Sequence, residues 1–150
     1  MADLRSLPRE QELHFNNRNI AEFRDNGGRV GGAFDGFPLL LLTSVGAKSG
    51  VERTSPMAAF TVDGHTYVVG SAAGRDADPA WVHNIRKTPA VTVELGSTSY
   101  RATAVELERA ERDRIFAVVS AQAPGFAEYQ RLTERVIPVF EIVPSTTEGN

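Results

Sequence analysis

Residues 39 to 57 read LLLLTSVGAKSGVERTSPM, where a run of leucines leads directly into a short segment of glycine, lysine and serine. The apolar stretch from Phe37 to Thr43 is too short for a helix and is typical of a buried strand. The glycines that follow favour an exposed loop. We therefore predict a buried strand, then a loop, and then a second strand from Met57.

The rest of the chain continues this pattern of short strands. Apolar or β-branched segments, which favour strands, occur at residues 37–43, 57–62, 66–71, 90–95, 99–107 and 138–143. Asp63-Gly64 and Gly96-Ser97 each separate two of them, and such dipeptides accept the positive φ angles of tight hairpin turns. The sequence thus predicts about six mostly antiparallel strands.

Helical signals stand between and after these strands, at residues 16–26, 79–87, 108–122 and 126–136. Asp78 is predicted to cap the second helix, with Pro79 at its first position. Charged residues at 106–114 are interpreted as a solvated helix face with local ion pairs. The order of elements predicts an α+β fold, with helices flanking a barrel-like antiparallel sheet.

Length and composition limit the function classes. The 150 residues fit one domain, which we place at 16–144, between a mobile arm at 1–15 and a disordered tail at 145–150. A net charge of −3 gives no general attraction to nucleic acid. The absence of cysteine excludes disulfides and thiolate metal sites, and the histidine spacing indicates no metal site. We expect a cytoplasmic protein, with the N-terminal arm as a candidate for peripheral membrane contact.

The loop at 43–56 does not match either of two well-known catalytic loops. A nucleotide-binding P-loop needs glycines where this chain has Leu42 and Ala47. The Gly-x-Ser-x-Gly hydrolase elbow fails because Lys48 stands two residues after Gly46. Two interpretations stay open: a solvated turn, or an anion site in which a cation, a hydroxyl and a guanidinium meet one ligand.

Several segments together resemble the deazaflavin-dependent nitroreductase family, whose members use reduced coenzyme F420. The matching segments occur in the family's order and cover most of residues 17 to 143. They are NRNIAEFRDNGGRVGG at 17–32, LLLLTSVGAKSGVERTSPM at 39–57, YVVGSAAG at 67–74, DPAWVHNIRKTPAVTVE at 78–94 and PGFAEYQRLTERVIPVF at 124–140.

The resemblance implies a split β-barrel related to flavin-reductase-type FMN-binding folds, with the deazaflavin in a groove beside the sheet. It implies that the loop at 46–53 holds the phosphate and oligoglutamate tail, through Lys48, Ser49, Gly50 and Arg53. It further implies that the ring lies along Pro56, Met57, Val69, Gly70, Ser71, Ala72, Ala73 and Gly74, with Trp81 and Asn84 nearby. A tight strand end, packed against its neighbours, is the alternative interpretation of residues 70–74.

The resemblance also implies the chemistry: hydride transfer from F420H2 to an electron-poor acceptor such as a quinone, an enone or a nitroaromatic. Tyr129 matches a tyrosine of the family's substrate pocket, and we expect Tyr129 and Ser71 to stabilise negative charge on the acceptor. Phe126 stands where some nitro-reducing relatives have a tyrosine, which makes nitroimidazole reduction less expected than cofactor binding. The alternatives are an FMN-dependent reductase on the same fold and a non-catalytic flavin carrier, and the protein is expected to be a monomer or a homodimer.

Overall fold

The computed structural model describes residues 20–21, 23–24, 39–96 and 98–145. The strands are β1 (Leu39–Val45), β2 (Glu52–Ala58), β3 (Phe60–Val62), β4 (His65–Val69), β5 (Ala90–Leu95), β6 (Thr98–Glu106) and β7 (Val139–Pro144). The helices are the 3₁₀ turn η3 (Ala72–Gly74), α2 (Ala80–Lys87), α3 (Arg109–Gln122) and α4 (Gly125–Arg131).

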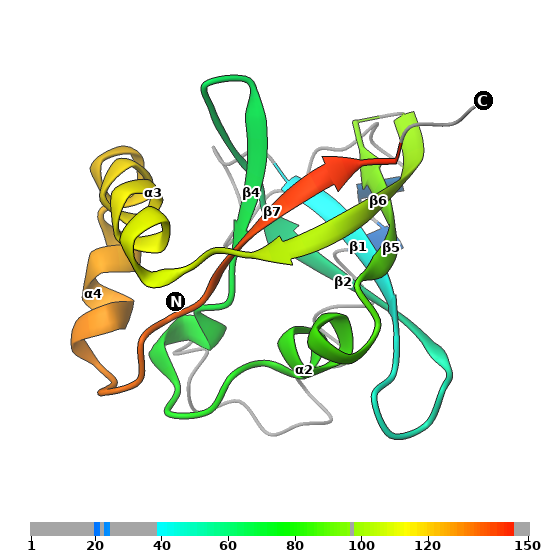
Figure 1. Cartoon of the computed structure of the whole chain (residues 1–150), viewed down its shortest axis with the longest axis horizontal. Helices are drawn as coiled ribbons and strands as arrows, with labels where there is room; N and C mark the ends of the chain where they lie inside the picture. The colour runs from blue at the N-terminus through cyan, green and yellow to red at the C-terminus, as the bar shows by residue number, and fades with distance from the viewer. Residues whose placement is uncertain (1–19, 22, 25–38, 97, 146–150) are drawn as a thin grey trace.

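The described strands form one antiparallel sheet that curls on itself, in the order β2-β1-β5-β6-β7-β4-β3. Its two edge strands, β2 and β3, are separated along the chain by the single residue Ala59. A sheet whose opposite edges are joined by one residue cannot lie flat, so it closes into a barrel that is open between those edges. Figure 1 shows this curl, with α2 on one side and with α3 and α4 on another.

The predicted fold class is confirmed, but the structure has seven strands where the sequence analysis expected about six. The predicted strand at 57–62 is divided at Ala59 into β2 and β3, which belong to opposite edges of the sheet. β2 also begins at Glu52, within the predicted loop, because residues 52–58 pair in register with β1. Arg53 and Pro56 therefore lie on a strand.

Both predicted hairpin turns are confirmed by their backbone angles. Asp63 and Gly64 have φ of 53° and 81° and connect β3 to β4. Gly96 has φ of 62° between β5 and β6. Residues without a Cβ, and Asp or Asn, adopt this region at the least cost, which is why these dipeptides predicted the turns.

The core has apolar clusters on both sides of β1. Leu40 and Leu42 point into the barrel, where they belong to one buried cluster with Val68, Val93 and Phe140. Leu39 and Leu41 face the other way and pack with Phe23. Burial on both faces explains the unbroken leucine run, which a half-exposed strand would interrupt with polar residues.

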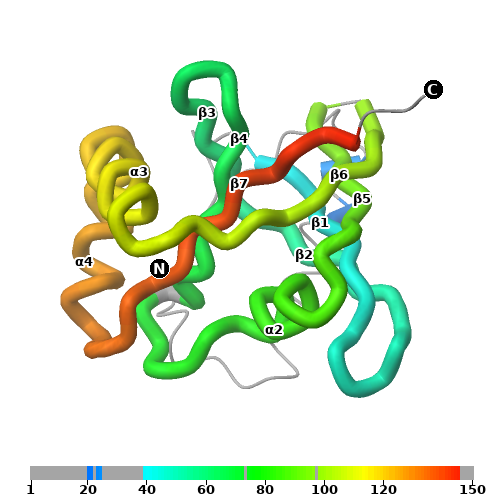
Figure 2. The backbone as a smooth tube through the Cα atoms, viewed as in Figure 1, coloured from blue at the N-terminus to red at the C-terminus, as the bar shows by residue number. Residues whose placement is uncertain are grey.

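A further buried cluster joins α3 to the strands β3, β4 and β7. Figure 2 shows the course of α3 beside these strands. Ile115, Val119 and Ala123 supply the helical side of the cluster, at the spacing of one helical face. Arg109–Asp113 and Glu111–Arg114 form the expected local ion pairs. The interpretation of this segment as a solvated face is wrong for Arg112, which is only 8% exposed because it shares the buried stripe with Ile115 and Val119.

The ends of two helices differ from the prediction. Asp78 was predicted to cap α2, but no side chain caps that helix, and the carboxylate of Asp78 instead binds Arg86 and Arg135. The helix predicted over 126–136 runs only from Gly125 to Arg131, so Arg135 lies in a connecting segment before β7. None of the helices in the described ranges has the length and apolarity needed to cross a bilayer.

The predicted arm at 1–15 and nearly all of the predicted tail at 145–150 lie outside the described residues. Of the helix predicted over 16–26, the structure describes residues 20, 21, 23 and 24, all of them helical. Arg24 in this piece forms a two-pronged ion pair with Glu94 of β5.

Candidate cofactor site

The turn between β1 and β2 is a closed backbone loop. Gly46 N donates to Val51 O at 2.8 Å, and Gly50 N donates to Gly46 O at 2.9 Å. Val51 N donates to the Ser49 hydroxyl at 3.1 Å. Gly50 has φ of +71°, and a Cβ atom on Gly46 would lie 2.5 Å from Ser49 Oγ. The positive φ favours glycine at position 50, and a side chain at position 46 would displace the Ser49 hydroxyl that accepts from Val51 N.

Helix α2 fixes this turn from the side. Ala47 N donates to Asn84 Oδ1 at 2.9 Å, and Lys87 Nζ donates to Ala47 O at 2.8 Å. Asn84 is 7% exposed, so its acceptor is withdrawn from solvent and holds the backbone of the turn. Asn84, predicted to lie near the cofactor, is thus placed against the segment predicted to bind the tail.

The two cations of this region, Lys48 and Arg53, are exposed. Neither forms a hydrogen bond or ion pair with the part of the chain that the structure describes. In contrast, several other described arginines, Arg86 and Arg135 among them, contact carboxylates. The Ser44 hydroxyl, on the residue paired with Arg53, is buried without a hydrogen-bond partner in the described ranges. An exposed, uncompensated pair of cations beside an orphaned hydroxyl fits a polyanionic ligand.

The strand end predicted to lie along the ring is tightly enclosed. A Cβ atom on Gly70 would lie 2.7 Å from Val82 Cγ2 and 3.0 Å from Pro138 Cγ. Gly74 has φ of +81°, and its Cβ would lie 3.0 Å from the carbonyl oxygen of Tyr129. Packing alone therefore requires glycine at both positions, as in the alternative interpretation from sequence. Among the neighbouring residues, Val69 is buried, and Ser71 and Ala72 are partly exposed.

Two neighbouring candidates on β2 face opposite sides of the sheet, because side chains alternate along a strand. Met57 is buried in the barrel cluster that contains Leu40. Pro56 is partly exposed and pairs with Leu41, whose side chain belongs to the outer cluster. One flat ring can thus lie against the side chain of only one of these two residues.

The aromatic candidates are half-buried. Trp81 packs on the barrel cluster, with its ring edge-to-face against Phe140 at a centroid distance of 6.0 Å. Tyr129 stands edge-to-face with Phe126 at 5.6 Å, and Phe126 does the same with Phe60 at 5.3 Å. The phenol oxygen of Tyr129 has no hydrogen-bond partner within the described ranges, so it is free to donate to a ligand.

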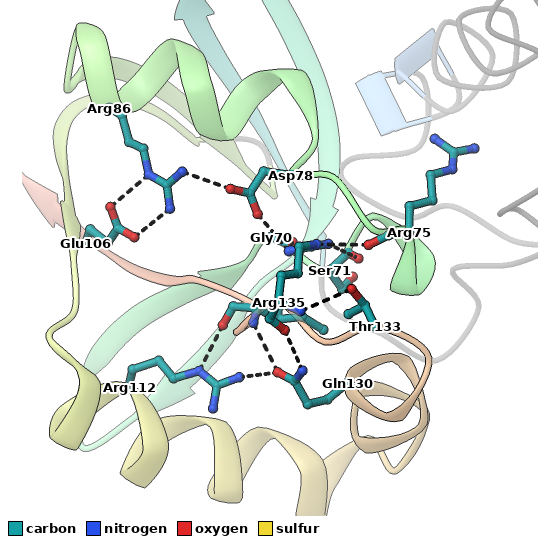
Figure 3. Close-up of polar contacts among 11 residues, drawn as sticks. Gly70, Ser71, Arg75, Asp78, Arg86, Glu106, Arg112, Gln130, Thr133 and Arg135 are labelled. Atoms are coloured by element: carbon teal, nitrogen blue, oxygen red, sulfur yellow. Dashed lines mark hydrogen bonds and ion pairs between the residues drawn. The ribbon is translucent and has the colours of Figure 1, made fainter.

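Sequence reasoning missed Arg135, whose guanidinium reaches into this region (Figure 3). Nε donates to Arg75 O at 2.9 Å, and Nη2 donates to Ser71 O at 2.8 Å. Nη1 donates to Asp78 Oδ1 at 2.7 Å and to Gly70 O at 3.2 Å. One side chain therefore holds two carbonyls of the predicted ring segment and the carbonyl of Arg75, the residue that follows it.

The ion pair between Arg135 and Asp78 belongs to a longer chain of charged side chains. Asp78 also accepts from Arg86, and Arg86 makes a two-pronged pair with Glu106, as Figure 3 shows. Hydrogen bonds to Glu106 and Asp78 raise the pKa of Arg86 further above its ordinary value, although burial opposes them. Burial is the larger influence on Arg135 and lowers its pKa, with the Asp78 carboxylate acting against it.

The model of the F420H(2)-dependent quinone reductase family matches residues 16–144. The chain belongs to this family. An F420H(2)-dependent quinone reductase of Mycobacterium tuberculosis is 33% identical over 124 residues, which cover 79% of this chain and 83% of that protein. The family membership confirms the resemblance seen in the sequence and makes the protein an oxidoreductase.

Solved structures agree with this family assignment. The structure of an F420-H2 dependent reductase, FDR-A, has a TM-score of 0.63 and 37% identity, covering 70% of this chain and 93% of that chain. A second solved structure, described as a domain-swapped dimer, has a TM-score of 0.65 and 31% identity, covering 91% of this chain and 99% of that chain. These similarities confirm the split barrel.

The described residues also form a hollow outside the candidate site, and they form no candidate metal site. A hollow lined by Ser99, Tyr100, Arg101, Pro144 and Ser145 lies at the ends of β6 and β7, and it contains none of the predicted site residues. Within the described ranges, no cluster of three or more histidine, cysteine or acidic residues is arranged to hold a metal ion.

Proposed function

We propose that this protein transfers a hydride from F420H2 to a quinone, with the cofactor's anionic tail held by the β1–β2 turn. The observation that carries the proposal is a pair of exposed cations, Lys48 on the β1–β2 turn and Arg53 at the start of β2. Asn84 and Lys87 fix the backbone of that turn. A rigid backbone lowers the entropy lost on binding, and uncompensated charges are available to a ligand. The name of the family supports F420 over the FMN alternative.

The side chains of the turn and of β2 bind the anionic tail, and the strand end at Val69–Gly74 contacts the ring. Lys48 and Arg53 pair with phosphate and carboxylate groups, and the Ser49 hydroxyl, which already accepts from Val51 N, donates its proton to the same anion. The segment from Val69 to Gly74 forms the wall beside the ring. When bound, F420H2 supplies the hydride, so the protein needs no nucleophile of its own.

The acceptor needs a proton donor, because a reduced quinone oxygen gains negative charge. The phenol of Tyr129 is half-buried and unpaired in the described structure, on a helix that packs against Gly74 of η3. The Ser71 hydroxyl makes no capping bond to η3 and is the second donor. Preorganised donors at such a position stabilise the charge that develops during reaction. Enones fit the same site, whereas nitroaromatics are weaker candidates because Phe126 carries no hydroxyl.

The test mixes the purified protein with F420H2 and follows cofactor oxidation after menadione or a nitroimidazole is added. We expect rapid, menadione-dependent oxidation, slower reaction with the nitroimidazole, and no tight binding of FMN in a fluorescence titration. Tight FMN binding without a response to F420 would reject the proposal. Binding of F420 without acceptor-dependent oxidation would identify a carrier instead.

The role of Tyr129 is tested separately with Tyr129→Phe. If the phenol assists proton transfer, kcat with menadione falls by at least about 100-fold, while the F420 dissociation constant stays unchanged. Tyr100→Phe is the matched control, since Tyr100 is also partly buried but lies at the end of the sheet that holds the separate hollow. Equal turnover of the two variants would assign Tyr129 a packing role.

We further propose that the protein forms a homodimer, since a solved relative covering 91% of this chain is described as a domain-swapped dimer. Light scattering at several protein concentrations measures the mass in solution. A mass near 16.3 kDa at all concentrations would show a monomer.

A further inference from the structure

Arg135 makes more contacts to the predicted ring segment than any other polar side chain in the described structure. Its three guanidinium nitrogens donate to the carbonyls of Gly70, Ser71 and Arg75 and to the carboxylate of Asp78, at 2.7 to 3.2 Å. The side chain is 15% exposed. A planar fork with several donors can hold three carbonyls at once, which a lysine ammonium cannot do in the same geometry.

The segment that Arg135 holds contains a strained residue. Ala72 has φ of +47°, a region that residues with a Cβ rarely adopt. Such a conformation is unfavourable and persists only where the surroundings enforce it. Ser71 O and Arg75 O, on either side of Ala72, are both bound by Arg135. The guanidinium therefore supplies part of that enforcement.

The position of Arg135 is itself fixed by its neighbours. Its carbonyl accepts from Gln130 Nε2 at 2.7 Å, and its amide donates to Thr133 Oγ1 at 3.3 Å. The Gln130 oxygen in turn accepts from Arg112 Nη2 at 2.7 Å and from Ile137 N at 3.0 Å. The network in Figure 3 thus connects α3 and α4 to the ring segment through a side chain with little freedom to move.

We propose that Arg135 is a positioning residue for the reduction, holding the backbone of residues 70–75 in the shape that receives the deazaflavin ring. The inference rests on the proposed function, because it takes that segment as the wall of the ring site. Arg135 acts through the carbonyls it binds and touches neither ring nor acceptor. Its loss is expected to weaken recognition of the ring, whereas loss of Lys48 and Arg53 weakens recognition of the tail.

The first test needs no cofactor and compares Arg135→Met with Arg112→Met. Arg112 is a matched control, since it is buried in the same network and donates to Ile137 O, but it does not contact residues 70–75. Both variants are expected to have a lower unfolding temperature. Amide hydrogen exchange over residues 70–75 rises more in Arg135→Met than in Arg112→Met, because Arg112 reaches that segment only indirectly, through Gln130 and Arg135. Equal protection of that segment in the two variants would overturn the proposal.

The second test measures affinity for F420 and for a tail-less deazaflavin that keeps the ring and its ribityl chain. Arg135→Met is expected to weaken both ligands more than about tenfold, or about 1.4 kcal/mol. Arg112→Met is expected to leave both within about threefold of the wild type. An unchanged affinity of Arg135→Met for the tail-less ligand would make Arg135 a stability residue only.

A conservative variant covers the case in which Arg135→Met does not fold. Arg135→Lys keeps the charge beside Asp78, so it should fold. It loses the planar fork of donors, so its dissociation constant for the tail-less ligand should be more than about tenfold higher than that of the wild type. Wild-type affinity in Arg135→Lys would overturn the proposal. If the wild type itself binds neither ligand, the proposed function fails, and the exchange experiment still decides whether Arg135 shapes the segment.

Discussion

The β1–β2 turn and the strand end at residues 70–75 are both fixed by polar contacts from distant parts of the chain, but they use charge in opposite ways. In the turn, a buried amide oxygen and a lysine hold the backbone of Ala47, while Lys48 in the turn and Arg53 at the start of β2 face solvent. At the strand end, the guanidinium of Arg135 points inward and donates hydrogen bonds to backbone carbonyls.

This difference indicates how one ligand with two unlike parts is recognised. A flexible, charged tail suits exposed cations on a rigid loop, where ion pairs with hydrogen bonds form on binding. A flat ring suits a wall whose shape is set beforehand and whose polar groups are already satisfied. The comparison therefore predicts that changes in the two regions affect different parts of the same ligand.

The largest expected effect is on stability, at the enclosed strand end. Gly70→Ala places a methyl group 2.7 Å from Val82 Cγ2 and 3.0 Å from Pro138 Cγ. Overpacking of this kind should lower the free energy of unfolding by about 2–3 kcal/mol, measured by urea denaturation. Gly125→Ala is the control, because nothing lies within 4 Å of its Cβ position. If the two variants are equally stable, the strand end is not tightly packed.

A smaller effect is expected at the anchor of the turn. Asn84→Ala leaves the amide of Ala47 without its acceptor and should reduce the free energy of unfolding by about 1–2 kcal/mol. The affinity for F420 should fall with it, since the cations lose their fixed support. Lys87→Met removes the exposed contact to Ala47 O and should change stability by less than about 0.5 kcal/mol. The reverse order of the two effects would show that the turn is held mainly by Lys87.

The smallest expected effect is a difference in salt dependence. Exposed charges are screened over about 10 Å at 0.1 M salt and over about 3 Å at 1 M. The dissociation constant for F420 should therefore rise several-fold over this range, while that of the tail-less deazaflavin stays nearly constant. Isothermal titration at three salt concentrations measures both. Parallel curves for the two ligands would contradict the division into tail and ring regions.

Much of the fold could be predicted because its determinants are local. Asp63-Gly64 and Gly96 carry the positive φ of their hairpins within one or two residues, and both turns were predicted correctly. The division of residues 57–62 into two strands could not be foreseen, because it depends on which edge of the sheet each half joins. Arg112 did carry a signal, since it stands three residues before Ile115 on the apolar stripe of α3.

The candidate site was predictable only where the family resemblance assigns a residue a role, and Arg135, although it stands in the matching segment 124–140, received none. Lys48 and Arg53 stand in a segment that matches the family, and their exposure follows from the glycine turn. Arg135 binds partners 57 to 65 residues away in the chain, and no spacing or propensity links it to them. The sequence also predicted Arg135 to lie in a helix over 126–136, whereas α4 ends at Arg131 and Arg135 lies in the connecting segment that reaches the ring region.

The most direct measurement of the central claim compares F420 and the tail-less deazaflavin on the double variant Lys48→Ala/Arg53→Ala. Arg101→Ala is the control for loss of a cation elsewhere on the surface, and Lys48→Ala and Arg53→Ala singly match its change of one charge. Arg101 is exposed on β6 and makes no side-chain ion pair in the described structure. The double variant should bind F420 more than about tenfold less tightly, about 1.4 kcal/mol or more, with unchanged affinity for the tail-less ligand. Unchanged F420 affinity, or an equal loss for both ligands, would show that the turn does not hold the tail.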